Sequence, residues 1–316
     1  MEKIKLALLS GGASQEREVS QKTGDIIFEA LDKEKYEIFR YDPKEDLTKL
    51  FIDASTNKFD IVLPALHGTF GEDGSLQGMF DLLKVPYLFS GLLSSAISMN
   101  KYIAKLLVKP MGINVANDLL IKKNEKIDIR NIISILSLPI VVKPVEQGSS
   151  IGVSLVHTKE ELENAIKNAM EHSHSALLES YVKGREFTVA IIGNDMPDAL
   201  PVIEIIPKVS TWFDYNAKYE DNGADEICPA VIPDELKTAL QEAAISIYKK
   251  LSCRDLGRAD FIVDSTTGLI YFIEMNTIPG MTKNSLLPKA AKEAGISFPS
   301  LLDRIIEDGL KDRTEK

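Results

Sequence analysis

The chain has 316 residues, of which 44% are hydrophobic and 27% charged, and its formal net charge is −10. This length predicts two or three globular domains, and the acidic balance argues against non-specific nucleic-acid binding, which needs a basic surface. The two cysteines form no CxxC motif and fit a reducing cytosol, and the lack of a run of about 20 apolar residues predicts no membrane-spanning helix.

The first 92 residues predict alternating strands and helices. The expected elements, in chain order, lie at residues 4–9, 20–31, 36–40, 61–66 and 76–83. This alternation indicates a parallel sheet with helices on its faces. Such sheets bind ligands outside the carboxyl ends of their strands. Two polar, glycine-bearing loops, residues 10–18 and 67–74, follow the first and third strands, and their shared edge predicts a site rather than two solvated turns.

Two familiar nucleotide-binding fingerprints are absent from the sequence. Neither loop of the first unit has the GxGxxG pattern of dinucleotide-binding folds, and no GxxxxGKS or GxxxxGKT occurs anywhere. A dehydrogenase built on the N-terminal sheet and a P-loop protein are therefore both disfavoured.

Residues 93–183 predict a second unit. Its helices are expected at 94–109, 132–137 and 158–170, and its strands at 139–144, 153–156 and 176–182. Thr158 and Glu161 predict a capping box at the start of the third helix. Between two strands lies the small-residue loop 148–152, which predicts a flap whose backbone N–H groups fold over phosphates. Lys143, five residues earlier, predicts a buried phosphate partner.

Three more features of this unit bear on ligands. Lys101 and Lys105 fall on the polar side of the first helix. Glu179 and Glu186 bracket an apolar segment, an arrangement that suits an adenine ring and ribose hydroxyls. His172-x-His174 has the spacing of a metal-binding pair, but it ends a helix in a polar stretch, and we expect both side chains to be exposed.

Residues 184–316 predict a third unit. Its strands are expected at 187–192 and 201–206, and its helices at 234–250, 286–294 and 298–309. The long polar loop 209–230 carries Trp212, Phe213, Tyr215 and Tyr219. Loops of this length are uncommon in compact domains and often act as lids, so we expect a lid here.

The same unit contains a predicted β-hairpin. Apolar runs at 259–263 and 269–273 flank a polar turn. Folding about this turn sets Asp260 opposite Glu274 and Arg258 opposite Asn276, on one face of the sheet. Two carboxylates and an amide oxygen suit Mg²⁺. The alternative is a surface ion network in which Arg258 neutralises the acids.

Six motifs carry a resemblance to a known family. They are GGASQEREVS, HGTFGEDGSLQGMF, VVKPVEQGSSIGVS, DYNAKY, GRADFIV and EMNTIPGMTKNSLLP. In this order and spacing they resemble the D-alanine–D-alanine ligase family of the ATP-grasp superfamily over essentially the whole chain. Phe80 and Asn117 depart from the commoner leucine and proline, at positions without a proposed role.

The resemblance implies an α/β, three-domain ATP-grasp fold. Residues 1–92 would form a Rossmann-like substrate domain, 93–183 the central domain, and 184–316 the catalytic domain with the lid 209–230. ATP would lie between the last two domains. The implied ATP contacts are Lys101 and Lys143 at the phosphates, Glu179, Ser180, Tyr181 and Val182 at the adenine, Glu186 at the ribose, Trp212 over the base, and also Ser150, Lys218 and Phe272.

The resemblance also implies metal and substrate contacts. Asp260, Glu274 and Asn276 would hold two Mg²⁺ or Mn²⁺ ions. Arg258 and the N–H of Gly280 would face the reacting carboxylate, Glu16 would orient the first D-alanine, and the remaining substrate contacts would be His67, Ser285 and Leu286. Glu16, Ser149 and Tyr219 resemble the trio that ties the lid shut in this family.

The implied activity is ATP-dependent condensation of two D-alanines through a D-alanyl phosphate, for peptidoglycan precursor synthesis. A cytoplasmic homodimer that contacts neither nucleic acid nor membrane is the family expectation. D-alanine–D-lactate and D-alanine–D-serine ligases are alternatives, although Tyr219 favours a dipeptide product. A non-catalytic ATP-binding regulator is a further alternative.

Overall fold

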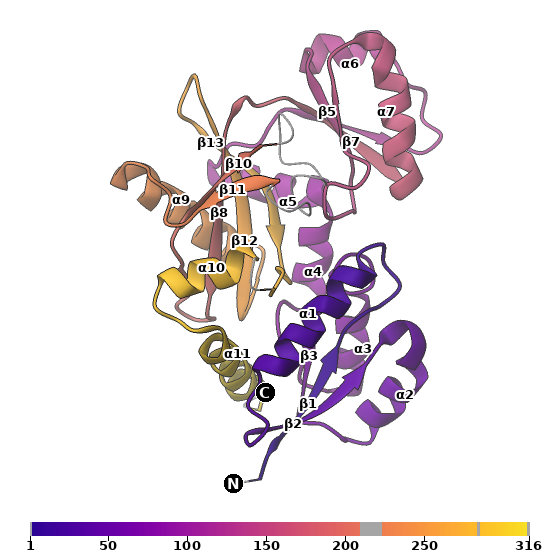
Figure 1. The fold of residues 1–316 in the computed structure, drawn as a ribbon. Helices are drawn as coiled ribbons and strands as arrows, with labels where there is room; N and C mark the ends of the chain where they lie inside the picture. The colour runs from indigo at the N-terminus through magenta and orange to yellow at the C-terminus, as the bar shows by residue number, and fades with distance from the viewer. Residues whose placement is uncertain (1, 209–222, 283–284, 315–316) are drawn as a thin grey trace.

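The computed structural model describes the whole chain except residues 1, 209–222, 283–284 and 315–316 (Figure 1). The described residues form three separate sheets. The N-terminal sheet lies at the bottom of Figure 1, the central sheet at the upper right, and the C-terminal sheet at the left, facing both. Among the described residues, none of the helices combines the length and the apolar character needed to cross a membrane.

The N-terminal sheet is parallel, as predicted. Its strands run in the order β2 (Tyr36–Tyr41), β1 (Ile4–Leu9) and β3 (Ile61–Pro64). Its helices are α1 (Arg17–Ala30), α2 (Pro43–Ser55) and α3 (Ser75–Leu83). The polar loops after β1 and β3 therefore lie at the same sheet edge. This edge faces the other two sheets.

The predicted helix 94–109 is wrong in one respect, because it is two helices. α4 (Leu92–Met99) and α5 (Lys101–Val108) are separated by Asn100. The side chain of Asn100 accepts a hydrogen bond from the Ile103 N–H at 3.0 Å, so it caps a new helix instead of continuing the first. A short 3₁₀ turn, η1 (Lys109–Met111), follows α5.

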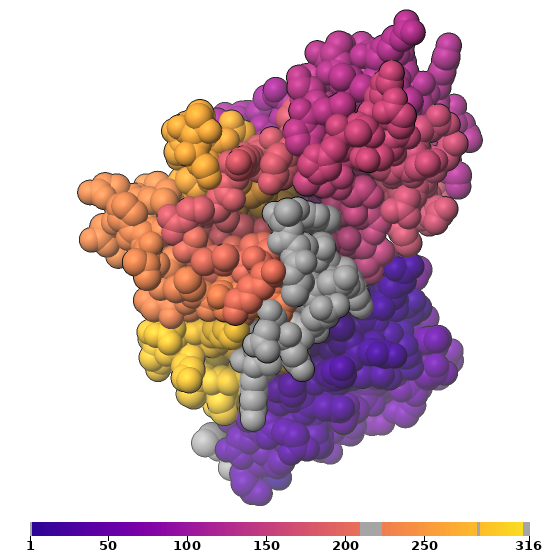
Figure 2. All heavy atoms as spheres, turned by 45° about the horizontal axis from the view of Figure 1, so that its top comes forward, coloured from indigo at the N-terminus to yellow at the C-terminus, as the bar shows by residue number. Residues whose placement is uncertain are grey.

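The central sheet is antiparallel. Its order is β4 (Asp118–Lys122), β7 (Ser175–Ser180), β5 (Ile140–Pro144) and β6 (Ser154–Val156), with helices α6 (Ile129–Leu136) and α7 (Lys159–His172). The predicted capping box of Thr158 and Glu161 is confirmed at the start of α7. Leu162 and Ile166 of α7 are fully buried against this sheet. Figure 2 shows the central elements as a magenta and pink mass at one end of the molecule.

The C-terminal sheet is the largest. Its order is β11 (Ala224–Ile227), β10 (Ile203–Pro207), β8 (Gly184–Ile192), β12 (Leu256–Asp264) and β13 (Ile270–Asn276), with the two-residue strand β9 (Asp198–Ala199) beside β8. Helix α9 (Asp234–Lys250) packs on β8 and β12. The last helices are α10 (Leu286–Glu293) and α11 (Phe298–Thr314), and α11 lies beside α1 (Figure 1).

Candidate active site

The β12–β13 hairpin has the predicted register. Arg258 pairs with Asn276 and Asp260 with Glu274. Directly after Asp260 the register shifts, so that Phe261 pairs with Phe272. This β-bulge bends the strands next to the acidic pair, as bulges beside functional sites often do.

Arg258 and Asp260 form a two-point ion pair. The Arg258 Nε and Nη2 atoms donate to Asp260 Oδ1 and Oδ2 at 2.9 and 2.8 Å. Asp260 also accepts from Thr188 Oγ1 at 2.5 Å and from Asn276 Nδ2 at 3.1 Å. Burial alone would lower the pKa of Arg258, but Asp260 and Glu274 raise it above its ordinary value. The guanidinium therefore stays charged, and the ion pair of the alternative interpretation, in which Arg258 neutralises the acids, is present for Asp260.

Two buried lysines lie near the hairpin, and one of them contacts it. Lys101, the first residue of α5, lies 3.2 Å from Glu274 Oε2 and donates to the Gln147 carbonyl at 2.6 Å. Lys143 of β5 pairs with Glu179 Oε2 at 2.6 Å. Lys101 thus brings positive charge to the acidic hairpin, whereas Lys143 is paired with a carboxylate of its own sheet.

These residues surround a cavity of about 150 Å³ between the central and C-terminal sheets, which we call the nucleotide cavity. The residues expected to contact ATP or metal that line it are Lys101, Lys143, Ser150, Glu179, Ser180, Tyr181, Val182, Glu186, Asp260, Phe272 and Glu274. Its further lining residues are Ala116, Val141, Gln147, Val153, Leu155, Ile262, Tyr271 and Ile273. The cavity therefore combines apolar walls with a few charged side chains, the usual character of a small-ligand site.

Glu179 occupies a position that sequence reasoning did not anticipate. Its carboxylate bridges two ammonium groups, accepting from Lys105 at Oε1 (2.5 Å) and pairing with Lys143 at Oε2 (2.6 Å). Burial raises the pKa of Glu179, but the two lysines outweigh burial and hold it below its ordinary value. Glu179 is therefore ionised, with both carboxylate oxygens engaged.

The N-terminal sheet contributes Glu16, which immediately precedes α1. The Ser149 hydroxyl of the glycine loop donates to Glu16 Oε1. A Cβ on Gly68 or Gly148 would lie 2.7 or 3.0 Å from Glu16 Oε2. Glycine at both positions thus lets the backbone of two loops approach the carboxylate closely. The structure brings Glu16 and Ser149 together, as the resemblance implies.

His67 and Glu72 lie in the loop after β3. The ring of His67 is 3.2 Å from Thr23 Oγ1. Burial, helped by the charge of Arg258, lowers the pKa of His67 to about 4, so the ring is neutral at pH 7. Burial, helped by the charge of Glu16, raises the pKa of Glu72 to about 8. Sequence reasoning marked this loop but assigned no role to Glu72; the only signal was an acid in a glycine-rich motif.

Gly280 follows β13 and packs closely against Ser285. A Cβ on Gly280 would lie 2.9 Å from Ser285 Oγ, which also accepts from the Thr282 N–H at 3.0 Å. Ser285 precedes α10, whose first residue is the buried Leu286. The three residues expected near the substrate are therefore neighbours at the end of the hairpin.

Three expected site residues, Trp212, Lys218 and Tyr219, lie outside the described residues, as does most of the expected lid. The ends of that loop are adjacent, because the Lys208 N–H donates to the Gly223 carbonyl at 2.9 Å. They close the β10–β11 hairpin at the margin of the C-terminal sheet.

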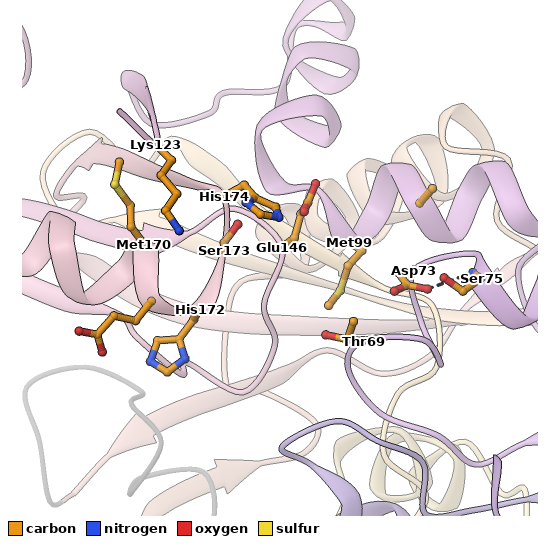
Figure 3. A pocket seen from close by; sticks show the side chains of 12 residues that line it. Thr69, Asp73, Ser75, Met99, Lys123, Glu146, Met170, His172, Ser173 and His174 are labelled. Atoms are coloured by element: carbon orange, nitrogen blue, oxygen red, sulfur yellow. Dashed lines mark hydrogen bonds between the residues drawn. The ribbon is translucent and has the colours of Figure 1, made fainter. Parts of the chain in front are cut away.

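A second cavity, of about 510 Å³, lies between the N-terminal and central elements (Figure 3). Met170, His172 and Lys123 line one side of it, and Asp73 and Ser75 the other. His174 is exposed as expected, whereas His172 is half-buried. Among the described residues, no cluster of three or more His, Cys, Asp or Glu side chains is assembled for a metal ion, so the histidine pair does not form such a site there.

Comparison with known proteins gives consistent matches. Residues 107–307 match the family model for the D-ala D-ala ligase C-terminus, and residues 40–90 match that for the N-terminus. A D-alanine–D-alanine ligase of Syntrophobacter fumaroxidans is 47% identical over 312 residues, covering 98% of this chain and 99% of that one.

Solved structures agree. The crystal structure of a D-alanine–D-alanine ligase from Bacillus anthracis complexed with ATP matches with a TM-score of 0.85 at 35% identity, covering 99% of both chains. A D-Ala:D-Ser ligase from Enterococcus faecalis matches with a TM-score of 0.84 at 33% identity, covering 98% of this chain and 100% of that one.

Proposed function

The chain belongs to the D-alanine–D-alanine ligase family, and we propose how its own residues divide the work of ATP-dependent ligation. The reaction joins two D-alanines into D-alanyl-D-alanine and converts ATP to ADP and phosphate. One observation carries the assignment of residues: the nucleotide cavity joins two buried lysines, an acidic hairpin and apolar walls.

ATP binds in the nucleotide cavity in this proposal. The apolar side chains that line it, Phe272 among them, take the adenine, and Glu186 takes the ribose. Lys101 and Lys143 meet the phosphates, where positive charge and positioning matter more than covalent chemistry. Both side chains are buried and line the cavity, which supports this role.

Asp260, Glu274 and Asn276 are the proposed metal ligands. Their oxygens are hard donors on one sheet face, the donor type that Mg²⁺ and Mn²⁺ take, so the residues fit a divalent ion. A bound divalent ion would supply neutralisation of the phosphate charge. Lys101 is already paired with Glu274, so this side chain links the cationic wall to the acidic one.

The amino-acid substrates bind between the hairpin and the N-terminal loops in this proposal. Glu16, held by Ser149, takes the ammonium of the first D-alanine. Arg258 and the Gly280 N–H face its carboxylate, which attacks the γ-phosphate to form D-alanyl phosphate. The amine of the second D-alanine, placed by Ser285 and Leu286, then displaces phosphate. Arg258 and Gly280 stabilise the oxyanion of that step, a contribution worth about 10²–10³ in rate per donor.

D-alanyl-D-serine is a second candidate product. The likeness to a D-Ala:D-Ser ligase at 33% identity favours it as an alternative acceptor reaction. Tyr219 in the motif DYNAKY favours a dipeptide over a D-lactate depsipeptide, and we favour D-alanine over D-serine as the acceptor because the relative at 47% identity is a D-alanine–D-alanine ligase. ADP release with D-alanine, D-serine and D-lactate as acceptors across pH 6 to 9 separates the three products.

The setting of the enzyme is also a proposal. Two free cysteines, Cys228 and Cys253, suit a reducing cytoplasm. We further propose that the enzyme works as a homodimer, in peptidoglycan precursor synthesis, with domains at 1–92, 93–183 and 184–316.

Glu274→Gln tests the proposed metal and phosphate site. It replaces a charged oxygen ligand with a neutral amide, so we expect near-complete loss of D-alanine-dependent ADP release with the fold retained. Glu163→Gln, an exposed acid on α7, is the control and keeps wild-type turnover. Wild-type turnover by Glu274→Gln would refute the assignment. If the wild-type protein binds ATP but shows no D-alanine-dependent ADP release, the alternative of a non-catalytic ATP-binding regulator would be supported.

A further inference from the structure

Lys105 is an unusual side chain for a soluble protein, because its relative exposure is only 2%. It lies one turn after Lys101 in α5 and contacts three acceptors. Its Nζ donates to the Ala116 carbonyl at 3.0 Å and pairs with Asp118 Oδ2 at 2.6 Å and Glu179 Oε1 at 2.5 Å. A buried ammonium is costly unless it is fully paired, so this arrangement needs a reason.

The contacts of Lys105 lead toward the nucleotide cavity without reaching it. The described lining of that cavity includes Glu179 and Lys143 but not Lys105. Glu179 connects them, because its two oxygens face Lys105 on one side and Lys143 on the other. An ammonium carries three N–H donors, so the bond to Glu179 leaves Lys143 two donors for phosphate oxygens.

We propose that Lys105 is a positioning residue that fixes Glu179 and thereby orients Lys143 toward the phosphates of the nucleotide. With Oε1 held by Lys105, the carboxylate cannot rotate away, and Oε2 defines the place of the Lys143 ammonium. Without Lys105, the Glu179 carboxylate can turn both of its oxygens toward Lys143, which draws the ammonium back from the cavity. The inference rests on the proposed function, in which Lys143 meets phosphate.

A merely structural role for Lys105 would give different binding data. If Lys105 only neutralised the two buried acids, its removal would disturb the whole cavity, and adenosine and ADP would lose affinity together. Orientation of Lys143 affects only ligands that carry phosphates. The ratio of ADP to adenosine affinity is therefore the decisive quantity.

The experiment measures adenosine and ADP binding by calorimetry in EDTA, so that only protein groups meet the phosphates. The variants are Lys105→Met, Lys143→Met and the double variant, and Lys109→Met, an exposed lysine just after α5, is the control. Lys105→Met should weaken ADP binding about tenfold while adenosine binding changes less than twofold. In the Lys143→Met background, Lys105→Met should have no further effect on ADP, because the two act as one unit.

An unchanged affinity ratio in Lys105→Met, or full additivity with Lys143→Met, would overturn the inference. If Lys105→Met does not fold, Lys105→Met combined with Asp118→Asn removes the cation together with one acid, and the same ratio applies. Lys105→Arg keeps the charge, so its ratio of ADP to adenosine affinity should lie between those of Lys105→Met and the wild type. These binding data do not depend on turnover, so a wild-type protein without ligase activity would refute the proposed function and leave this test intact.

Discussion

His67 and Glu72 lie five residues apart in one loop, yet burial shifts their pKa values in opposite directions. For His67 the charged form is the protonated one, so burial lowers its pKa, to about 4. For Glu72 the charged form is the deprotonated one, so burial raises its pKa, to about 8. Near neutral pH the loop that carries His67 and Glu72 is therefore less charged than its sequence indicates.

His67 gives a pH-dependent contribution to stability whose sign follows from its pKa. Its pKa of about 4 in the folded state lies below the ordinary value of 6.5, so between these values the unfolded chain binds more protons. The contribution of His67 to stability therefore falls on acidification, by about 2 kcal/mol between pH 7 and pH 5. We expect His67→Gln to lack this part of the pH dependence.

Urea unfolding at pH 7 and pH 5 measures this difference. The comparison is between the pH dependences of the two proteins, not their absolute stabilities, because the substitution also changes packing. Equal pH dependence in the wild type and in His67→Gln would show that the ring is not held neutral by burial.

Single residues differ in how well the sequence predicts them. The pairing of Asp260 with Glu274 follows from the period of a strand and the position of a turn, both of which are local. The burial of Lys105 is not local, since it depends on Asp118 and Glu179 from two other strands. Glu72 is missed for the same reason: its raised pKa depends on burial and on the charges of Glu16 and Glu274, which come from other segments.

At the scale of elements, the break between α4 and α5 positions Lys101, which lines the nucleotide cavity. Asn100 caps α5 with its oxygen and donates from Nδ2 to Glu146 Oε1 at 2.7 Å. Lys101 adds two bonds to the same segment, from its N–H to the Val145 carbonyl and from Nζ to the Gln147 carbonyl. The start of α5 is thus attached to residues 145–147, which connect β5 to the glycine loop.

Asn100→Ala and Glu146→Ala separate the two parts of this attachment. Glu146→Ala removes one hydrogen bond and should cost about 0.5–1.5 kcal/mol. Asn100→Ala also removes the cap, worth about 1 kcal/mol more. Both should raise the KM for ATP through a less fixed Lys101, with the larger rise in Asn100→Ala.

Steady-state kinetics and chemical unfolding check this order. Glu171→Ala is the matched control, because Glu171 is an exposed acid that lines the same cavity as Glu146. A KM for ATP that is unchanged in both test variants would contradict the role of the attachment.

The elements that the sequence does not predict have weak local signals. α2 has a good start, with Asp42 accepting from the Lys44 N–H and Pro43 in the first turn, but exposed Leu47, Phe51 and Ile52 blur its apolar stripe. β4 and β11 border their sheets, and their burial is only partial. Such strands are specified by their neighbours more than by their own pattern.

At the scale of the whole molecule, the N-terminal and C-terminal elements share one hydrophobic core. This core joins Leu6 and Leu8 of β1 to Leu287 of α10 and Leu302 of α11. Across the same contact, Tyr36 donates to Asp303 at 2.6 Å. The central sheet has a separate core, whose described members all come from residues 119–178. Phe272, which lines the C-terminal half of the nucleotide cavity, belongs to a third core with Phe261. The two halves of the nucleotide cavity therefore lie on different cores.

This division predicts two separable effects of core mutations. Leu162→Ala removes a fully buried side chain from the central core, and Leu302→Ala does the same in the shared core, each at a cost of about 2–5 kcal/mol. In hydrogen exchange, Leu162→Ala should speed exchange in β5, β7 and α7 alone. Leu302→Ala should speed exchange in β1 and β8 together, because α11 completes the core of both sheets. Exchange that rises across all three sheets in Leu162→Ala would show one cooperative unit instead.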